Sequence, residues 1–67
     1  MNITLNNRLE VFDNNNLTIS DILKLKNFTF KMLVIKVNGK LIKKTDYSIT
    51  KIVDRDDVQI LHMISGG

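Results

Sequence analysis

Cysteine is absent from this 67-residue chain, and with it the chemistry that cysteine supplies. Without cysteine there is no disulfide, no thiolate metal site and no thiol nucleophile, which fits a reducing compartment. The single histidine, His62, has neither a second histidine nor a cysteine with which to form a zinc site or a catalytic dyad. We therefore expect His62 to be an ordinary strand residue.

Phosphate-binding loops and membrane segments are also missing. The chain has three glycines, and they form no glycine-rich loop that could cradle phosphate groups, so any ATP must be bound by a partner protein. No apolar run approaches the roughly 20 residues that cross a bilayer. Met1 precedes polar and alternating residues rather than a secretory signal. We expect a cytoplasmic protein that binds no metal, no cofactor of its own and no membrane.

The formal net charge of +3 arises mainly from lysines that are spread along the chain. Lys40, Lys43 and Lys44 form the densest cluster, and Phe28 and Phe30 could in principle stack on bases. Surface lysines more commonly serve solvation. We expect no nucleic-acid partner. At this length the chain buries one small core, which predicts a single domain over residues 1–67.

The first half of the chain predicts a β-hairpin followed by a short helix. Apolar and polar residues alternate from Asn2 to Asp13 in two runs broken by Asn6-Asn7-Arg8. Thr18 can cap a helix, and Asp21 can reach back to it as in a capping box. A helix of about two turns is expected from residue 19 to 26, with an apolar face that covers one side of a sheet.

The second half predicts another hairpin and then a crossover. Leu33, Ile35 and Val37 share one face of a strand before Asn38-Gly39, a strong signal for a tight turn. The return strand contains Leu41 and Ile42, and a turn follows from Thr45 to Ser48. From the irregular connection beyond this turn, two apolar side chains are expected to fill the core: Ile49 and Ile52.

An acidic turn, Asp54-Arg55-Asp56-Asp57, leads into a final strand over residues 58–63. Three aspartates in one turn supply fewer oxygens than the six to eight that calcium requires, so we expect a turn role for them. The order ββαββ, crossover, β predicts an α+β protein. Its mixed sheet packs on one short helix, with the last strand able to lie centrally, as in a β-grasp fold.

The chain ends in Gly66-Gly67, which leaves the terminal carboxylate on a segment without side chains. Glycine lets the backbone pass through a narrow channel. Ile64 and Ser65 extend the reach, so a flexible tail is expected over residues 64–67. A carboxylate becomes an acyl electrophile once it is converted to an acyl-adenylate. Gly67 is therefore a candidate reactive group.

These features together resemble the small ubiquitin-like sulfur carriers, most closely the ThiS family of the thiamin pathway, which is related to MoaD. The resemblance covers nearly the whole chain. It rests on the hairpin containing Asn6, the segments 17–23 and 34–39, the acidic turn ending at Asp56 and the terminal diglycine. In two places the chain departs from the family pattern: Arg55 replaces the usual glycine of Asp-Gly-Asp, and Lys43-Lys44 replaces Pro-Arg. A left-handed Arg55 would cost roughly 1–2 kcal/mol, so the turn could take another shape.

The resemblance implies a protein co-substrate rather than an enzyme. A ThiF-like adenylating enzyme, using ATP and magnesium, would activate Gly67, and a cysteine desulfurase or another sulfur-transfer protein would convert it to a thiocarboxylate. Thiazole synthase, ThiG, would then receive the sulfur. In this scheme Gly66 provides clearance, and Ser65 and Ile64 guide the tail.

Docking requires a surface, and the last strand offers one. If Val58 and Ile60 point inward, then Gln59, Leu61 and Met63 point outward and form a partner-binding patch beside the tail. A strand covered on both faces is the alternative. Three other functions remain open: the small subunit of molybdopterin synthase, a ubiquitin-like modifier that forms an isopeptide bond, and a binding module with an incidental tail.

Overall fold

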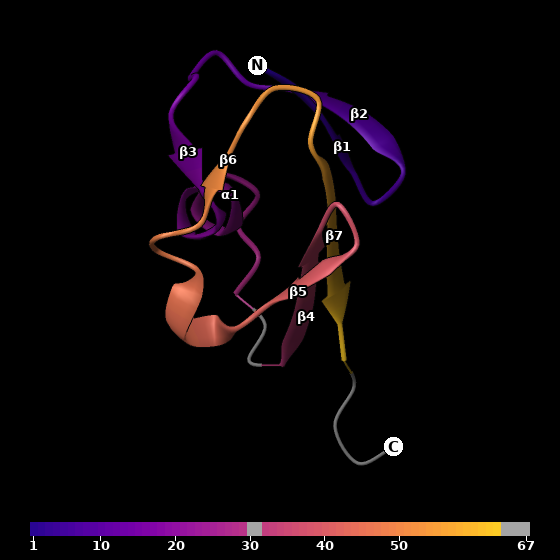
Figure 1. The fold of residues 1–67 in the computed structure, drawn as a ribbon, viewed down its shortest axis with the longest axis vertical. Coiled ribbons are helices and arrows are strands. Elements are labelled where there is room, and N and C mark those ends of the chain that lie inside the picture. Colours follow the sequence, from indigo (N-terminus) through magenta and orange to yellow (C-terminus); the bar gives the residue numbers. More distant parts are fainter. Residues whose placement is uncertain (30–31, 64–67) are drawn as a thin grey trace.

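A five-stranded mixed sheet dominates the computed structural model, which describes residues 1–29 and 32–63 (Figure 1). The strand order is β2-β1-β7-β4-β5. The bounds are β1 (Asn2–Leu5), β2 (Arg8–Val11), β4 (Leu33–Val37), β5 (Lys40–Ile42) and β7 (Asp57–His62). β1 and β7 run parallel, and the other neighbours run antiparallel. The last strand is therefore central, in the β-grasp arrangement predicted for this α+β chain.

The N-terminal hairpin is present, with a two-residue turn at Asn6 and Asn7. Both residues have positive φ, 51° and 68°, as a type I′ turn requires, and asparagine tolerates this conformation better than most residues. The turn fixes the register, in which Thr4 pairs with Leu9. Leu9 and Val11 consequently lie on the face opposite to Ile3 and Leu5, and both are exposed.

The helix α1 (Ile19–Leu25) begins and ends within one residue of its predicted bounds. The predicted capping box is confirmed: Asp21 N donates to Thr18 Oγ1 at 3.2 Å, and Thr18 N donates to Asp21 Oδ2 at 3.0 Å. Its last turn leads to Lys26, whose Nζ lies 2.5 Å from Glu10 Oε1 on β2. No helix in residues 1–29 and 32–63 is long and apolar enough to cross a membrane.

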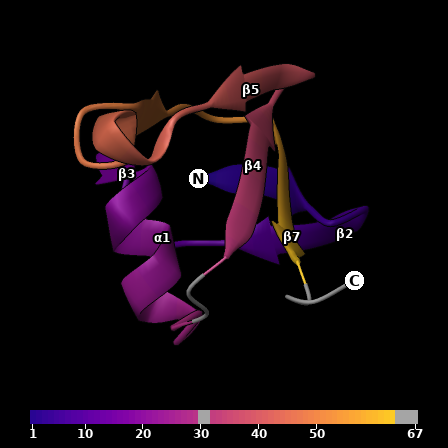
Figure 2. The ribbon, with the colours of Figure 1, turned by 90° about the horizontal axis from the view of Figure 1, so that it is seen from below.

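The core lies between α1 and one face of the sheet. Figure 2 shows α1 on one side of β4 and β7; on the opposite side it shows β2, which is a strand of the same sheet. Among residues 1–29 and 32–63, nine apolar residues are buried, all of them aliphatic: Ile3, Leu5, Leu17, Ile19, Ile22, Ile35, Ile52, Val58 and Ile60. This one-sided packing leaves the outer face of the sheet open.

The second hairpin turns at Asn38 and Gly39, as predicted, with φ values of 52° and 82°. Its register places Ile35 opposite Ile42 on β5 and opposite Ile60 on β7. These three side chains therefore share the inner face.

The connection between β5 and β7 contains a 3₁₀ helix, η1 (Lys44–Asp46), and a short strand, β6 (Lys51–Ile52). β6 pairs with β3 (Leu17–Thr18) in a two-stranded sheet that the sequence did not predict. Ile52 fills the core as expected.

The expectation that Ile49 also fills the core is wrong, because Ile49 is 71% exposed. Ile49 N and Thr50 N both donate to Asp46 O, so the chain is still turning at this residue. The partly buried Tyr47 packs against the core from the same turn instead.

The acidic turn keeps a left-handed residue despite the loss of glycine. Arg55 has φ 70°, whereas the other non-glycine residues with positive φ are all asparagines in the described part of the chain. Its side chain is 91% exposed, with only a 3.8 Å contact to Asp54 Oδ2. The backbone strain is thus not offset by side-chain packing.

Candidate functional site

β7 carries the chain from the middle of the sheet toward the C-terminus. It is paired along both sides, with β1 and with β4. Beyond its last residue, Met63 N donates to Met32 O at 2.9 Å. The chain is therefore held up to residue 63. The four predicted tail residues follow, and Ile64, Ser65, Gly66 and Gly67 lie outside the described residues.

The side chains of β7 alternate between the two faces of the sheet. Val58 and Ile60 point into the core and are buried. Gln59 lies on the outer face and is partly exposed, while Leu61 is 46% exposed and Met63 47% exposed. Of the two arrangements considered from the sequence, the structure has the one with a single covered face.

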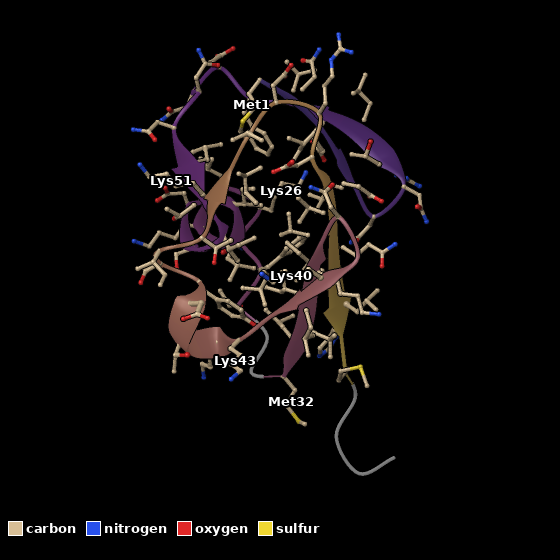
Figure 3. All side chains as sticks on the ribbon, viewed as in Figure 1. Met1, Lys26, Met32, Lys40, Lys43 and Lys51 are labelled. Carbon is tan, nitrogen blue, oxygen red and sulfur yellow. The ribbon has the colours of Figure 1, made fainter. Side chains whose placement is uncertain are left out.

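A second set of apolar side chains comes from the chain beside β7. Val34 is the direct partner of Leu61 in the antiparallel ladder, so both side chains lie on the outer face. Met32, which is labelled in Figure 3, is also exposed, and its carbonyl accepts the backbone hydrogen bond from Met63 N. We call these four residues the exit patch: Met32, Val34, Leu61 and Met63.

A groove of about 820 Å³ opens beside the exit patch. Met32, Val34 and Met63 belong to its lining, together with apolar residues from α1, β4, β5 and the loops between them. Two lysines border this region: Lys44 lines the groove, and Lys36 pairs with Gln59 on the outer face. The apolar surface near the exit of the chain thus has a positively charged margin.

Asn6 holds the last strand in place. Its Nδ2 donates to Ile60 O at 3.0 Å, and its Oδ1 accepts from Ile60 N at 2.8 Å. Asn6 N also donates to Val58 O at 2.9 Å. The parallel pairing of β1 and β7 thus continues into the hairpin turn. Sequence reasoning noted Asn6 only as part of the hairpin, because its partner is 54 residues away.

Two carboxylates of the acidic turn, those of Asp54 and Asp56, accept hydrogen bonds from protein donors. Asp56, which is buried, accepts from Asn38 Nδ2 at 3.0 Å and from Val53 N at 2.9 Å. Asp54 Oδ1 accepts from Asn2 N at 2.7 Å. No three potential metal ligands gather anywhere in the described ranges 1–29 and 32–63. The hydrogen bonds of Asp54 and Asp56 within and beside the turn confirm the turn role expected for these two residues.

Two further titratable residues, His62 and Asp21, belong to regular elements of the fold. His62 is the last residue of β7 and pairs with Leu33, as expected of a strand residue. The pKa of the Asp21 carboxyl is lowered from its ordinary value of 3.8, mainly because it accepts a hydrogen bond from the Thr18 backbone and also one from the Thr18 hydroxyl. That shift stabilises the start of α1, away from the exit patch.

The geometry is thus a rigid strand end beside an exposed apolar patch, with no catalytic cluster among the described side chains. Such a site can present a terminal segment to another protein.

Comparison with known proteins identifies relatives over the whole fold. The chain is 32% identical over 50 residues to the sulfur carrier protein ThiS of Bacillus subtilis (strain 168), which covers 75% of this chain and 76% of that protein. The crystal structure of the thiamine biosynthesis protein ThiS from Geobacter metallireducens matches all of both chains, with 26% identity and a TM-score of 0.87.

A solution structure of a thiamine biosynthesis protein from Geobacter metallireducens is also similar. Its TM-score is 0.78 at 26% identity, and the match covers all of this chain and 88% of that one. The ThiS family model matches residues 2–67, including the terminal diglycine. On this evidence the chain belongs to the ThiS family.

Proposed function

We propose that this protein is a sulfur carrier of thiamin biosynthesis that carries sulfur on Gly67 as a thiocarboxylate. The observation that carries the proposal is the family match over residues 2–67, which runs through the diglycine. The structure adds support, since β7 is central and held as far as Met63. Four further residues can span at most about 14 Å, enough to bring a carboxylate into a partner's active site.

The chemistry needs two steps on the terminal carboxylate. A ThiF-like enzyme, with ATP and magnesium, transfers AMP to an oxygen of Gly67 and releases pyrophosphate. A persulfide on a cysteine desulfurase or another sulfur-transfer protein then attacks the acyl carbon, and AMP leaves with the oxygen. A second thiol reduces the resulting acyl disulfide, which releases the thiocarboxylate and leaves a disulfide between that thiol and the donor cysteine. The product is a thiocarboxylate, which donates its sulfur to a thiazole synthase of the ThiG type. The carrier is consumed and regenerated as a co-substrate in the cytoplasm.

In this proposal the exit patch docks on each partner in turn. Leu61 and Met63, with Gln59 beside them, are about half exposed and lie directly before the tail. A partner that covers them also fixes the direction in which Ile64 and Ser65 enter its channel. Gly66 provides the clearance that a side chain would remove.

Intact mass spectrometry tests the proposal directly. The protein is incubated with ATP, magnesium, a ThiF-like activating enzyme and a sulfur source, beside a form that lacks Gly67. A mass gain equal to the exchange of one oxygen for sulfur is expected in the full chain and not in the shortened one. Hydroxylamine added before the sulfur source should trap the acyl-adenylate as a hydroxamate.

Other outcomes distinguish the remaining functions. Higher-mass conjugates on lysines of other proteins would indicate a modifier. Sulfur delivery to a molybdopterin precursor, but not to a thiazole synthase, would indicate a molybdopterin synthase subunit. An unchanged mass with a cognate enzyme that activates another carrier would overturn the proposal.

A further inference from the structure

The outer edge of β2 is the longest unpaired strand edge of the sheet. β2 lies at one end of the strand order and pairs only with β1. Phe12 N donates to Met1 O at 2.8 Å, and bonded pairs alternate along an antiparallel ladder. Arg8 and Glu10 therefore direct their backbone groups toward β1. Leu9 and Val11 direct their N–H and C=O groups away from the sheet.

The same two residues also expose apolar side chains. Leu9 is 72% exposed and Val11 64% exposed, both on the outer face. Edge strands are normally protected by charged side chains, proline, a bulge or a covering element. β2 is short and carries two charged side chains, Arg8 and Glu10, which protect it against strands with unmatched charges. The two residues whose backbone is free, Leu9 and Val11, carry no charge. The edge is therefore suited to strand addition.

We propose that β2 pairs in antiparallel fashion with β2 of a second copy of this chain, about a two-fold axis at Leu9. In that register Leu9 lies opposite Leu9 of the second copy, and their outward N–H and C=O groups bond reciprocally. Arg8 lies opposite Glu10 of the second copy, and Glu10 opposite its Arg8. The segment Arg8-Leu9-Glu10 is thus complementary to itself in both charge and shape.

The charges also select this register over the competing one. Only two antiparallel registers pair three residues of β2 and bring outward backbone groups together. The second has its axis at Glu10, which places two glutamates directly opposite each other at the close, non-bonded spacing, where like charges repel. The Leu9 register instead adds an arginine to a glutamate that Lys26 already contacts.

The proposed dimer leaves the exit patch free. β7 lies two strands away from β2, and the two-fold axis is perpendicular to the sheet. The outer faces of both copies therefore lie on the same side, and their β7 strands end in opposite directions. Because β2 has only four residues, we expect a weak, concentration-dependent association at the low end of interface sizes.

Sedimentation equilibrium over a concentration series tests the dimer. The weight-average mass should rise from 7.7 kDa toward twice that value as the protein approaches millimolar concentration. Leu9→Lys should abolish the rise, because it places two ammonium groups opposite each other. Ile49→Lys is the matched control, since Ile49 is 71% exposed elsewhere on the surface, and it should behave as wild type.

A charge exchange tests the register itself. Arg8→Glu alone, and Glu10→Lys combined with Lys26→Glu, should each lose self-association, whereas an equimolar mixture of the two should associate. The second variant keeps the internal ion pair with its signs reversed. In the wild type, the amide NMR signals of Leu9 and Val11 should shift with concentration. A constant mass of 7.7 kDa, association that survives Leu9→Lys, or a mixture no better than its components would overturn the proposal.

Discussion

The side-chain amide of Asn6 binds the backbone of Ile60 as the peptide group of a neighbouring strand would. Its Nδ2 donates to the Ile60 carbonyl at 3.0 Å, and its Oδ1 accepts from the Ile60 N–H at 2.8 Å. A hairpin turn and the last strand are thereby joined across almost the whole length of the chain. This bond holds β7 at the residue before Leu61, where the exit patch begins. The stability of the exit patch should therefore depend on a residue in the first hairpin.

Asn6→Gly should lower the free energy of unfolding by about 1–3 kcal/mol. Glycine keeps the positive φ of the turn, so the lost stability comes from removing the side-chain amide. Without that amide, the N–H and C=O groups of the buried Ile60 have no partner. Asn7→Gly is the matched control, since no bond of the Asn7 side chain is present among the described residues, and it should be close to neutral. Urea unfolding measures both variants, and equal losses would contradict the role assigned to Asn6.

Arg55→Gly should stabilise the protein by roughly 0.5–1 kcal/mol. A left-handed non-glycine residue costs about 1–2 kcal/mol, and the greater freedom of glycine in the unfolded chain offsets part of the gain. The side chain contributes little, because it is 91% exposed. Thermal and urea unfolding give the difference.

Arg55→Ala provides the control for that measurement. It removes the guanidinium but keeps a Cβ on the same backbone, so it should give no comparable gain. If alanine stabilises as much as glycine, then the side chain and not the backbone conformation is responsible.

The elements that the sequence predicted are those with signals contained within a few residues. The capping box of Thr18 and Asp21 spans three residues, and Asn38-Gly39 specifies its turn without help from the rest of the chain. Simple alternation also predicted which residues of the last strand face outward, because each buried residue places its two neighbours on the opposite face of the sheet.

The features that were not predicted depend on pairing between distant segments. Val34 joins the exit patch only through its register with Leu61. Alternation from Leu33 to Val37 places Val34 on the opposite face from Ile35, but it does not reveal which strand lies beside it. Hydrophobicity alone predicts a core position for Ile49, whereas the turn after η1 directs it to solvent. β3 and β6, with two residues each, are too short to give a periodic signal.

The Asp21 carboxylate should make the stability of the helix depend on acid pH. Its pKa is lowered in the folded protein, so its contribution is fully present above the unfolded value of 3.8 and is lost as the pH falls through the lower, folded pKa. Asp21→Asn should lower the melting temperature at neutral pH. The difference from wild type should shrink steadily below about pH 4, as followed by circular dichroism. A constant difference down to pH 2 would show that charge is not involved.

Leu61→Asp should weaken the docking of a ThiF-like activating enzyme without unfolding the protein. Leu61 is 46% exposed on a face that no described element covers, so the native state has room for the carboxylate in solvent. A partner that buries this position would instead have to desolvate a charge. We expect the apparent affinity in the adenylation reaction to fall about tenfold or more, equivalent to at least ~1.4 kcal/mol.

Ile49→Asp is the matched control for Leu61→Asp, because it places the same charge at an exposed apolar residue outside the exit patch. It should leave adenylation unchanged. Concentration dependence of pyrophosphate release measures both variants, and circular dichroism verifies that each is folded. The proposed chemistry is at Gly67 and not at Leu61. A docking defect should therefore raise the carrier concentration needed for half-maximal rate and leave the rate at saturation nearly intact. Equal effects of the two substitutions would indicate that net charge, rather than the exit patch, governs recognition.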